Sequence, residues 1–322
     1  MGKFAYTGFW DDFSLDNILL KTIQEVCQLE MVHDIYQANY LLYSVFSNDH
    51  WFVSDDVIKI FYTGENVTPD FNACDYAIGF DWMDFGDRYL RFPLFYLYDD
   101  ICELMESKHQ IPVNEIIKNK LNFCSITISN TKRNTIFKEL FERMSAYKKV
   151  DSGGYWANNI GGPIEDKFSF DLSHKFSLVC ENSSYPGYTT EKLVQAFAAN
   201  CIPIYWGDPE VGRVFNKKAF VNVLDYESIS DVIEIVKRID NDPDLYQAML
   251  REPALADNQY KKENMMNALK SYLSGIFNTP IEKARRRNRD CRGEMYISAH
   301  QRQVKESVDI FSKMRQFIGR KY

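Results

Sequence analysis

The densest group of side chains that could do chemistry lies in residues 181–192. A polar loop, residues 181–188, follows an apolar strand-like run, and Thr190-Glu191-Lys192 begins the predicted helix that comes next. The free N–H groups and partial positive charge of a helix N-terminus suit a phosphate group. A lysine is unfavourable at that end of a helix, and a bound diphosphate would remove the conflict. The alternative interpretation is that a threonine caps the helix and Lys192 is a solvated surface residue.

The elements around this loop alternate between short apolar strands and amphipathic helices, which is typical of parallel α/β sheets. Ligands of such sheets bind in the loops at the carboxyl ends of the strands, where residues 181–188 lie. Strands are predicted at residues 3–7, 29–34, 38–45, 57–62, 76–79, 121–128, 175–180, 202–205 and 219–223. The main helices are predicted at residues 15–27, 98–120 (with breaks), 133–147, 190–200 and 228–239.

The length of 322 residues suggests about two domains of roughly 150 residues each. The two successive groups of strands predict an α/β fold of two facing Rossmann-like domains, with a substrate cleft between them. We expect the first domain at residues 1–120, the second at 121–280 and a basic helical tail at 281–322, since the chain beyond Pro253 has a helical pattern.

The composition excludes several classes of protein. Hydrophobic residues make up 45% and charged residues 26%, which excludes global disorder. No apolar run approaches the roughly 18 residues of a membrane-spanning helix, and the first residues do not resemble a signal peptide. The seven cysteines include no Cys-x-x-Cys pair, which fits reduced thiols better than disulfides or a zinc site. These features predict a cytoplasmic location.

Charge is distributed unevenly along the chain. Residues 281–322 hold 12 Lys or Arg and 5 Asp or Glu, a balance of +7, whereas the other 280 residues hold 26 and 40, a balance of −14. The acidic remainder argues against a nucleic-acid enzyme. In the tail, Val304, Val308, Phe311 and Ile318 form an apolar stripe beside basic residues. Such a helix either lies peripherally on anionic lipid at the inner face of a membrane or packs on the N-terminal domain; the sequence leaves both alternatives open.

The block from Glu181 to Gly207 resembles the donor-binding motif of the α-1,3/4-fucosyltransferases of glycosyltransferase family ten. The matching runs are Glu181-Asn182-Ser183, Tyr188, Thr190-Glu191-Lys192, Ala196-Phe197 and Pro203-Ile204-Tyr205-Trp206-Gly207. Further matches lie at residues 62–66, 75–81, 87–91, 151–154, 158–161 and 220–223. The resemblance covers roughly residues 57–255, and the bacterial members are the most similar.

The resemblance implies a GT-B fold and inverting transfer of L-fucose from GDP-β-L-fucose, the activity of a hexosyltransferase. The acceptor would be a hydroxyl, O3 by expectation, of GlcNAc or glucose in a glycan such as N-acetyllactosamine or lipopolysaccharide. The donor-binding residues that it implies are Lys192 and Arg133 at the diphosphate, Glu191 at the ribose hydroxyls, and Asn182 and Tyr188 lining the same pocket. Without the resemblance, Arg133 is an ordinary cation in a first helical turn. Glu181 ranks below these residues, as a buried structural carboxylate.

An inverting transfer needs a general base for the acceptor hydroxyl. The resemblance implies Glu65, and its position agrees, because it follows the predicted strand 57–62 and Gly64 permits a sharp turn. An exposed loop glutamate is the alternative. Asp81 and Asp84 are competing acids on the acceptor side. The bacterial members often carry Asp-Glu-Leu-Asp where this chain has Asp81-Trp82-Met83-Asp84, so Trp82 either stacks on a sugar or belongs to the core.

No metal site is predicted. The five histidines are far apart in sequence, and the acidic run Asp240, Asp242 and Asp244 follows a helix, whereas a metal-binding Asp-x-Asp of a transferase would follow a strand. We therefore expect no obligatory metal or cofactor, and GDP-fucose and an oligosaccharide as the partners. The alternatives are a GT-B enzyme that uses another nucleotide sugar and a non-catalytic glycan-binding protein.

Overall fold

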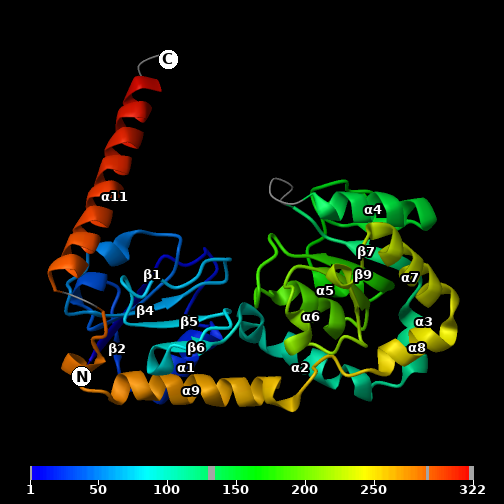
Figure 1. The fold of residues 1–322 in the computed structure, drawn as a ribbon, viewed down its shortest axis with the longest axis horizontal. Helices are drawn as coiled ribbons and strands as arrows, with labels where there is room; N and C mark the ends of the chain where they lie inside the picture. Colours follow the sequence, from blue (N-terminus) through cyan, green and yellow to red (C-terminus); the bar gives the residue numbers. More distant parts are fainter. Residues whose placement is uncertain (1, 130–134, 288–289, 319–322) are drawn as a thin grey trace. The chain divides into compact units, whose positions relative to one another are not determined.

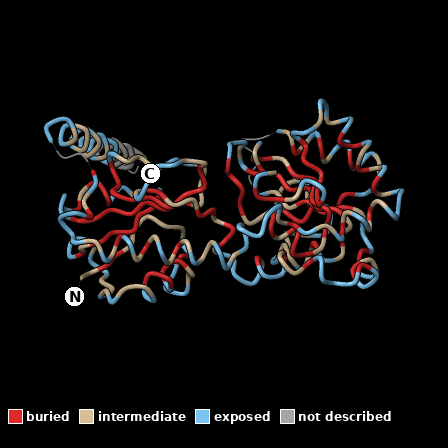
Figure 2. The backbone as a smooth tube through the Cα atoms, turned by 60° about the horizontal axis from the view of Figure 1, so that its bottom comes forward, coloured by how far each residue is buried: buried red, intermediate tan, exposed pale blue. Residues whose placement is uncertain are grey.

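The computed structural model describes residues 2–129, 135–287 and 290–318, with side chains as far as residue 308 (Figure 1). The chain divides into two compact units. Unit 1 comprises Met1–Gly79, Met83–Phe92 and Ala268–Tyr322, and unit 2 comprises Phe80–Trp82 and Pro93–Asn267. Each unit is built on one parallel sheet, and Figure 2 shows that the buried stretches of the chain gather in the interior of each unit.

Unit 1 holds a six-stranded parallel sheet in the order β2-β1-β3-β4-β5-β6. Its strands are β1 (Lys3–Thr7), β2 (Glu30–Met31), β3 (Tyr40–Tyr43), β4 (Ile58–Tyr62), β5 (Tyr76–Gly79) and β6 (Tyr89–Arg91). Every residue of β3, β4 and β5 is buried, as expected for parallel strands that are covered on both faces. Because all pairs are parallel, the loops that follow β1, β3 and β4 emerge at the same edge of the sheet.

The helices of unit 1 come from both ends of the chain. α1 (Ile18–Val26) begins after Asn17, whose side chain accepts a hydrogen bond from the Leu19 N–H. The residues of α9 (Lys262–Asn278) from Ala268 on belong to unit 1, and among them Leu269, Leu273 and Ile276 are buried. The Tyr272 hydroxyl on α9 donates to the carbonyls of Ala77 and Arg88, which ties this late helix to β5 and to the start of β6.

Three consecutive arginines follow the short helix α10 (Ile281–Ala284) and anchor it to unit 1. Arg285 pairs with Asp56 at 2.7 Å, Arg286 pairs with Asp87, and Arg287 Nε lies 3.1 Å from Asp75 Oδ2. The last pair is buried, since the side chains of Arg287 and Asp75 are 3% and 0% exposed. Arg285, Arg286 and Arg287, three of the basic residues of the segment 281–322, thus hold this segment on unit 1.

The long helix α11 (Cys291–Ile318) packs its first turns on unit 1. Tyr296 donates to the carboxylate of Asp70 at 2.5 Å, and the His300 ring stacks on Trp51 with ring centroids 4.6 Å apart. The Gln301 amide donates to the Trp51 carbonyl at 2.6 Å. Packing on the N-terminal part of the chain, one of the two alternatives for the tail, is therefore present in the described side chains of this helix.

Unit 2 holds a five-stranded parallel sheet in the order β11-β10-β9-β7-β8. Its strands are β7 (Asn122–Ile126), β8 (Val150–Ser152), β9 (His174–Cys180), β10 (Ile202–Trp206) and β11 (Val221–Asn222). Its helices are α2 (Asp99–Ser107), α3 (Val113–Asn119), α4 (Ile136–Tyr147), α5 (Lys167–Asp171), α6 (Glu191–Ala198), α7 (Ile229–Asn241) and α8 (Pro243–Arg251).

The α/β class with a parallel sheet in each half is confirmed, and most predicted elements are present. The division by contacts differs from the expected ranges 1–120 and 121–280, because residues 93–120 belong to unit 2 and the chain from Ala268 to unit 1. All seven cysteines are free, and five of them are buried, as predicted for reduced thiols. Among the described helices, none combines the length and the apolar character that are needed to cross a membrane.

Candidate active site

The loops after β9 and β10 lie side by side at one edge of the unit 2 sheet. β9 and β10 pair in parallel register from Phe176 with Ile202 to Cys180 with Trp206. The Glu181 N–H then continues the pairing by donating to the Trp206 carbonyl at 2.9 Å. This register brings the predicted donor loop, residues 181–190, against residues 207–210, which follow β10.

Glu181 organises the start of α6. Its buried carboxylate accepts hydrogen bonds from the Thr190 N–H at 2.8 Å and from the Thr190 hydroxyl at 2.7 Å. It also accepts one from Lys192 Nζ at 3.2 Å, while Lys192 Nζ donates to the Thr190 hydroxyl at 2.9 Å. The carboxylate thus satisfies an unpaired helix N–H and holds the ammonium group at the end of α6 where backbone donors are free.

The charge of Lys192 is stabilised by its neighbours. Burial alone lowers the pKa of an ammonium group, but the carboxylates of Glu181 and Glu191 outweigh burial and raise the pKa of Lys192 well above its ordinary value. The Lys192 side chain stays 27% exposed, whereas the Glu181 side chain is fully buried. A positively charged group is therefore presented at a helix N-terminus, which is the arrangement that suits a phosphate.

Asp208 fixes the shape of the loop before α6. Its buried carboxylate accepts hydrogen bonds from the Gly187 N–H at 2.8 Å and from the Thr189 hydroxyl at 3.3 Å. The Asp208 N–H donates to the hydroxyl of Tyr205 at 2.9 Å, and that hydroxyl lies 3.4 Å from the Thr189 hydroxyl. The side chains of Tyr205, in β10, and Asp208, just beyond it, therefore hold the donor loop in place.

The donor loop also contacts the short segment Phe80–Trp82, which belongs to unit 2. Gly187 has φ +85°, and a Cβ atom there would lie 2.5 Å from the Phe80 carbonyl, so glycine is required for both reasons. The Tyr188 ring is buried edge-on against Phe80, with centroids 5.1 Å apart. Burial and the Asp81 carboxylate raise the pKa of Tyr185.

Trp82 is half-buried and contacts two side chains of unit 2. The Arg213 guanidinium lies 3.7 Å from the centre of its ring, and the Tyr260 ring approaches edge-on with centroids 6.5 Å apart. Of the two nearby acids, Asp81 is buried in unit 2, whereas Asp84 is exposed in unit 1, where it accepts the Gly86 N–H at 3.1 Å. The two acids therefore differ in exposure and belong to different units.

A second loop reaches the same edge of the unit 2 sheet after β8. A Cβ atom on Gly154 would lie 2.1 Å from the Ile128 carbonyl oxygen, so only glycine allows this backbone to pass the end of β7. Asn159 Oδ1 accepts the Ser152 N–H at 2.8 Å, and the Asn158 side chain donates to the Gly154 carbonyl at 2.9 Å. Arg133, the second predicted diphosphate ligand, lies outside the described residues.

Glu65 lies in unit 1, at the carboxyl edge of its sheet. β4 ends at Tyr62, the buried Thr63 accepts the Glu65 N–H through its hydroxyl at 3.1 Å, and the Glu65 side chain is half-buried. Unit 2 brings together Asn182, which is exposed, Tyr188, Glu191 and Lys192 in one loop and helix start. The predicted site residues are thus divided between the two units.

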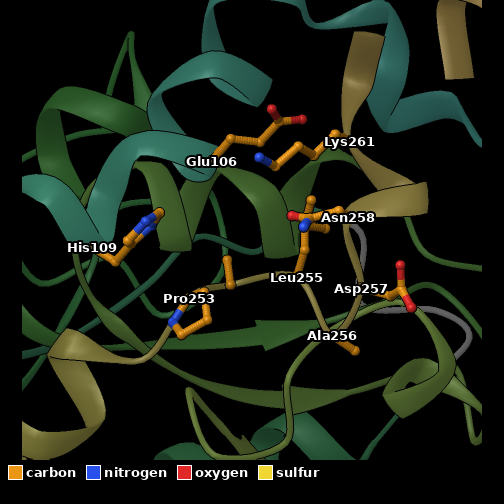
Figure 3. A pocket seen from close by; sticks show the side chains of 9 residues that line it. Glu106, His109, Pro253, Leu255, Ala256, Asp257, Asn258 and Lys261 are labelled. Atoms are coloured by element: carbon orange, nitrogen blue, oxygen red, sulfur yellow. The ribbon is translucent and has the colours of Figure 1, made fainter. Parts of the chain in front are cut away.

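A pocket elsewhere in unit 2 has no predicted site residue in it. It has a volume of about 480 Å³ and lies between the end of α2 and the linker before α9, with Glu106, His109 and Lys261 projecting around it (Figure 3). The neighbouring Lys108 donates to the carbonyls of Leu250 and Glu252 and lies 5.8 Å from the centre of the Phe197 ring, near the C-terminus of α6. The donor loop lies at the other end of that helix.

The sequence identifies one of the two residues that build the loop: Glu181 is the buried structural carboxylate that was predicted. Asp208 is not identified by the sequence analysis. The available signal was the position of each residue in the sequence. Glu181 directly follows the buried strand β9, and Asp208 lies two residues beyond the end of β10. Among the described residues, no group of three or more His, Cys, Asp or Glu side chains could hold a metal ion.

Comparison with known proteins gives one consistent family. The model of the α-(1,3)-fucosyltransferase FucT N-terminal domain matches residues 4–98, and that of the glycosyltransferase family 10 (fucosyltransferase) C-terminal region matches residues 117–273. An α-(1,3)-fucosyltransferase FucT of Helicobacter pylori is 32% identical over 255 residues, which is 70% of this chain and 53% of that protein. A putative fucosyltransferase of Acanthamoeba polyphaga mimivirus is 27% identical over 69% of this chain and 38% of its own length.

Solved structures agree with this result. A crystal structure of an α1,3-fucosyltransferase superposes with a TM-score of 0.75 and 27% identity, and the match covers 87% of this chain and 91% of that one. A crystal structure of α1,3-fucosyltransferase with GDP-fucose gives a TM-score of 0.73 and 26% identity over 86% and 90% of the two chains. The chain spans about half or less of the length of the two curated relatives, and nine-tenths of these solved chains.

Proposed function

The chain belongs to glycosyltransferase family 10 and has the GT-B fold, and from this premise we propose that it is an inverting α-1,3-fucosyltransferase. The donor is GDP-β-L-fucose. The acceptor is a hydroxyl, O3, of GlcNAc or glucose in a glycan such as N-acetyllactosamine or a lipopolysaccharide antigen. One solved relative is described with GDP-fucose and another with GDP, which supports a guanosine diphosphate donor.

The observation that carries the proposal is the Lys192 ammonium at the N-terminus of α6. Departure of GDP leaves negative charge on a diphosphate, and fixed cations and backbone N–H donors stabilise that charge without reorganising. Lys192 is held by Glu181 and Thr190 before any ligand binds, and its raised pKa keeps it charged. Arg133 is proposed as the second cation, and Glu191, Asn182 and Tyr188 as the ligands of the nucleoside and sugar.

Inversion requires that the acceptor oxygen attack the anomeric carbon from the face opposite to GDP. The acceptor hydroxyl must lose its proton as this bond forms, so a carboxylate is needed on the acceptor side. Glu65 is proposed for this role, because it lies at the carboxyl edge of the unit 1 sheet with its backbone held by Thr63. The diphosphate charge is balanced by cations in this scheme, and no metal is required.

The location in the cell is part of the proposal. A cytoplasmic enzyme with access to GDP-fucose fits the reduced cysteines. Contact of the basic C-terminal segment with the inner face of a membrane is proposed only for the part of α11 beyond its packed turns, since Tyr296, His300 and Gln301 already contact unit 1. Fractionation of cells that express the full chain, before and after a high-salt wash, tests this contact.

The test of the function is a donor and acceptor screen. The purified chain is incubated with GDP-fucose, GDP-mannose or UDP-GlcNAc, each with N-acetyllactosamine or lactose, and products are analysed for linkage. We expect transfer from GDP-fucose alone, with an α-1,3 linkage. Transfer from another donor instead would make the protein a different GT-B enzyme. Binding of glycan without turnover of any donor would make it a glycan-binding protein.

A further inference from the structure

Three neighbouring strands of unit 1 each place a distinctive residue at the same distance beyond their ends. β1 ends at Thr7, β3 at Tyr43 and β4 at Tyr62, and the residues three positions further on are Trp10, Phe46 and Glu65. The strands are adjacent and parallel in the order β1-β3-β4, so the three loops emerge together at one edge. The loops that carry Trp10 and Phe46 therefore leave the same edge of the unit 1 sheet as the loop of the proposed general base.

These aromatic residues are partly open to solvent. The Phe46 side chain is 54% exposed and its neighbour Val45 is 37% exposed, while Trp10 is half-buried. Trp10 rests edge-on against the buried Phe13, with centroids 5.1 Å apart, and Phe9 stacks on Phe13 at 3.8 Å. Exposed aromatic surface supported by a buried aromatic core is typical of ligand-binding surfaces rather than of a random exposed residue.

The two aromatic loops are locked to one another. The Phe46 N–H donates to the Gly8 carbonyl at 2.9 Å, and the Ser44 N–H donates to the Thr7 carbonyl at 3.1 Å. Gly8 has φ +72°, and a Cβ atom there would lie 2.9 Å from the Ser44 carbonyl, so glycine permits this close approach. A surface whose backbone is already fixed loses little conformational entropy when it binds a ligand.

Polar groups border the aromatic residues. The Thr7 hydroxyl lies 3.3 Å from the Ser47 hydroxyl and donates to Asp49 Oδ2 at 2.9 Å, and the Ser47 hydroxyl also donates to Asp49 at 3.0 Å. Hydroxyl and carboxylate groups beside aromatic rings match the chemistry of a sugar, which has apolar C–H faces and a rim of hydroxyls. A lipid would not use the polar border, and the Asp49 carboxylate in that border disfavours an anion.

Resting on the proposed function, we propose that Trp10 and Phe46 form an acceptor subsite that binds a pyranose ring next to the sugar that is fucosylated. Adjacent strands are about 4.8 Å apart, so the Phe46 loop lies one strand spacing, and the Trp10 loop about two, from the Glu65 loop along the edge. These spacings suit consecutive rings of a short glycan whose reacting hydroxyl is at Glu65. The subsite selects acceptors of two or more sugars over monosaccharides.

The test compares acceptor binding with donor chemistry in the same variants. Phe46→Ala and Trp10→Ala should each raise the KM for N-acetyllactosamine about three- to tenfold, a range set by the modest strength of single aromatic contacts. The KM for GlcNAc alone and the hydrolysis of GDP-fucose in water should not change. Phe46→Tyr should restore the disaccharide KM, because the ring is retained. Tyr36→Ala, which removes a 64% exposed aromatic residue near the start of β3, is the matched control and should have no effect.

Two results would overturn the subsite. One is an unchanged disaccharide KM in both alanine variants while wild-type transfer is normal; the proposed function would then stand without the subsite. The other is an equal rise of the KM for GlcNAc and for the disaccharide, which would place the rings at the reacting sugar instead. If the wild type transfers no fucose, saturation-transfer NMR with N-acetyllactosamine decides the question separately. Loss of the signal in Trp10→Ala but not in Tyr36→Ala supports the subsite, and an unchanged signal rejects it.

Discussion

Lys192 and Glu181 illustrate how single residues set the chemistry of this chain. The lysine stands at the end of a helix where a cation is unfavourable, and a buried carboxylate, rather than solvent, compensates it. The sequence places Lys192 in the first turn of a helix, as observed, and its binding of a diphosphate stays a prediction. The compensating role of Glu181 could not be predicted, because it depends on the β9–β10 register that buries this side chain beside Thr190.

Removing the proposed diphosphate cations should weaken donor binding. Lys192→Ala and Arg133→Ala are each expected to cost about 2–5 kcal/mol in GDP-fucose affinity, because truncation leaves diphosphate charge unmatched in a partly desolvated site. Isothermal titration calorimetry of GDP and GDP-fucose measures the loss. Lys218→Ala, which removes an exposed lysine of unit 2, is the control. Unchanged affinity in both cation variants would remove the diphosphate assignment.

Glu181→Gln should change the pH dependence of donor binding. Burial lowers the pKa of Lys192, and the variant removes the largest opposing charge, so its pKa should fall relative to wild type. A lowered lysine pKa means that the charge is lost as pH rises, so GDP affinity should decline at alkaline pH in the variant before it does in the wild type. Titrations of GDP between pH 6 and 10 check this.

The control for that experiment is Glu210→Gln. Glu210 is a neighbouring glutamate that pairs with Arg213 at 2.7 Å and is 43% exposed. The Glu210→Gln variant should keep the wild-type pH dependence of GDP affinity. If Glu181→Gln lowers GDP affinity equally at every pH, the carboxylate acts only on the loop conformation and not on the Lys192 charge.

Glu65→Gln should abolish transfer without loss of donor binding. The amide is nearly isosteric but cannot accept the acceptor proton, and removal of a general base typically costs about 10²–10⁴-fold in rate. GDP-fucose affinity, measured by calorimetry, should be that of wild type. Near-normal transfer in this variant, together with inactive Asp81→Asn or Asp84→Asn, would move the base to the next loop.

At the scale of elements, buried parallel strands were the most predictable feature. The predicted strands 3–7 and 76–79 have the bounds of β1 and β5. A short apolar run bounded by turn residues is typical of a buried strand. β6 and β8 were not predicted: β8 consists of Val150–Ser152, with two polar residues in three, and gains its strand character only by pairing with β7. α1 begins at Ile18, three residues later than the predicted residue 15, because Asn17 caps it by accepting the Leu19 N–H.

The C-terminal arginines offer a direct comparison of buried and exposed pairs. Arg287 donates to Asp75 from both its backbone and its side chain, and to the carbonyls of Asp55 and Val57. Arg287→Ala should lower the free energy of unfolding by about 3–5 kcal/mol, because it leaves a buried carboxylate without its cation. Arg285→Ala removes a pair whose acid, Asp56, is 81% exposed, and should cost about 0–1 kcal/mol.

Urea denaturation of Arg287→Ala and Arg285→Ala measures the loss in the free energy of unfolding for each variant. Asp75→Asn provides a second route to the same pair, since Asp75 Oδ1 accepts the backbone N–H groups of Arg286 and Arg287 at 2.8 and 3.0 Å. Equal and small losses in Arg287→Ala and Arg285→Ala would show that the buried pair does not stabilise unit 1.

At the scale of the whole molecule, the two-sheet architecture was predictable from the alternation of strands and helices, but its chain path was not. A boundary near residue 120 follows from counting elements in order. The packing of α2 on α6 and of α9 on unit 1 depends on contacts between distant residues, such as Tyr272 with Ala77, that no local pattern encodes. The first and last parts of the chain therefore share unit 1.

Fucosyl transfer should survive removal of divalent metal. Protein cations balance the diphosphate charge in the proposed mechanism, so activity in excess EDTA should remain a sizeable fraction of the untreated level. Rates with EDTA, and with EDTA followed by Mn²⁺ or Mg²⁺, measure this. Complete loss of activity that Mn²⁺ restores would show that a metal takes part.

The pairing of Asp75 with Arg287 has a consequence for biosynthesis. A ribosome adds about 5–20 residues per second, so Asp75 leaves the exit tunnel at least ten seconds before Arg287 does. Throughout that interval the carboxylate that belongs in the centre of unit 1 lacks its guanidinium and the two N–H donors beside it. Unit 2 needs only residues 80–267 and can form first. The buried pair of unit 1 cannot form until Arg287 has emerged, and chaperones that bind apolar strands are expected to associate with residues 3–79 during that interval.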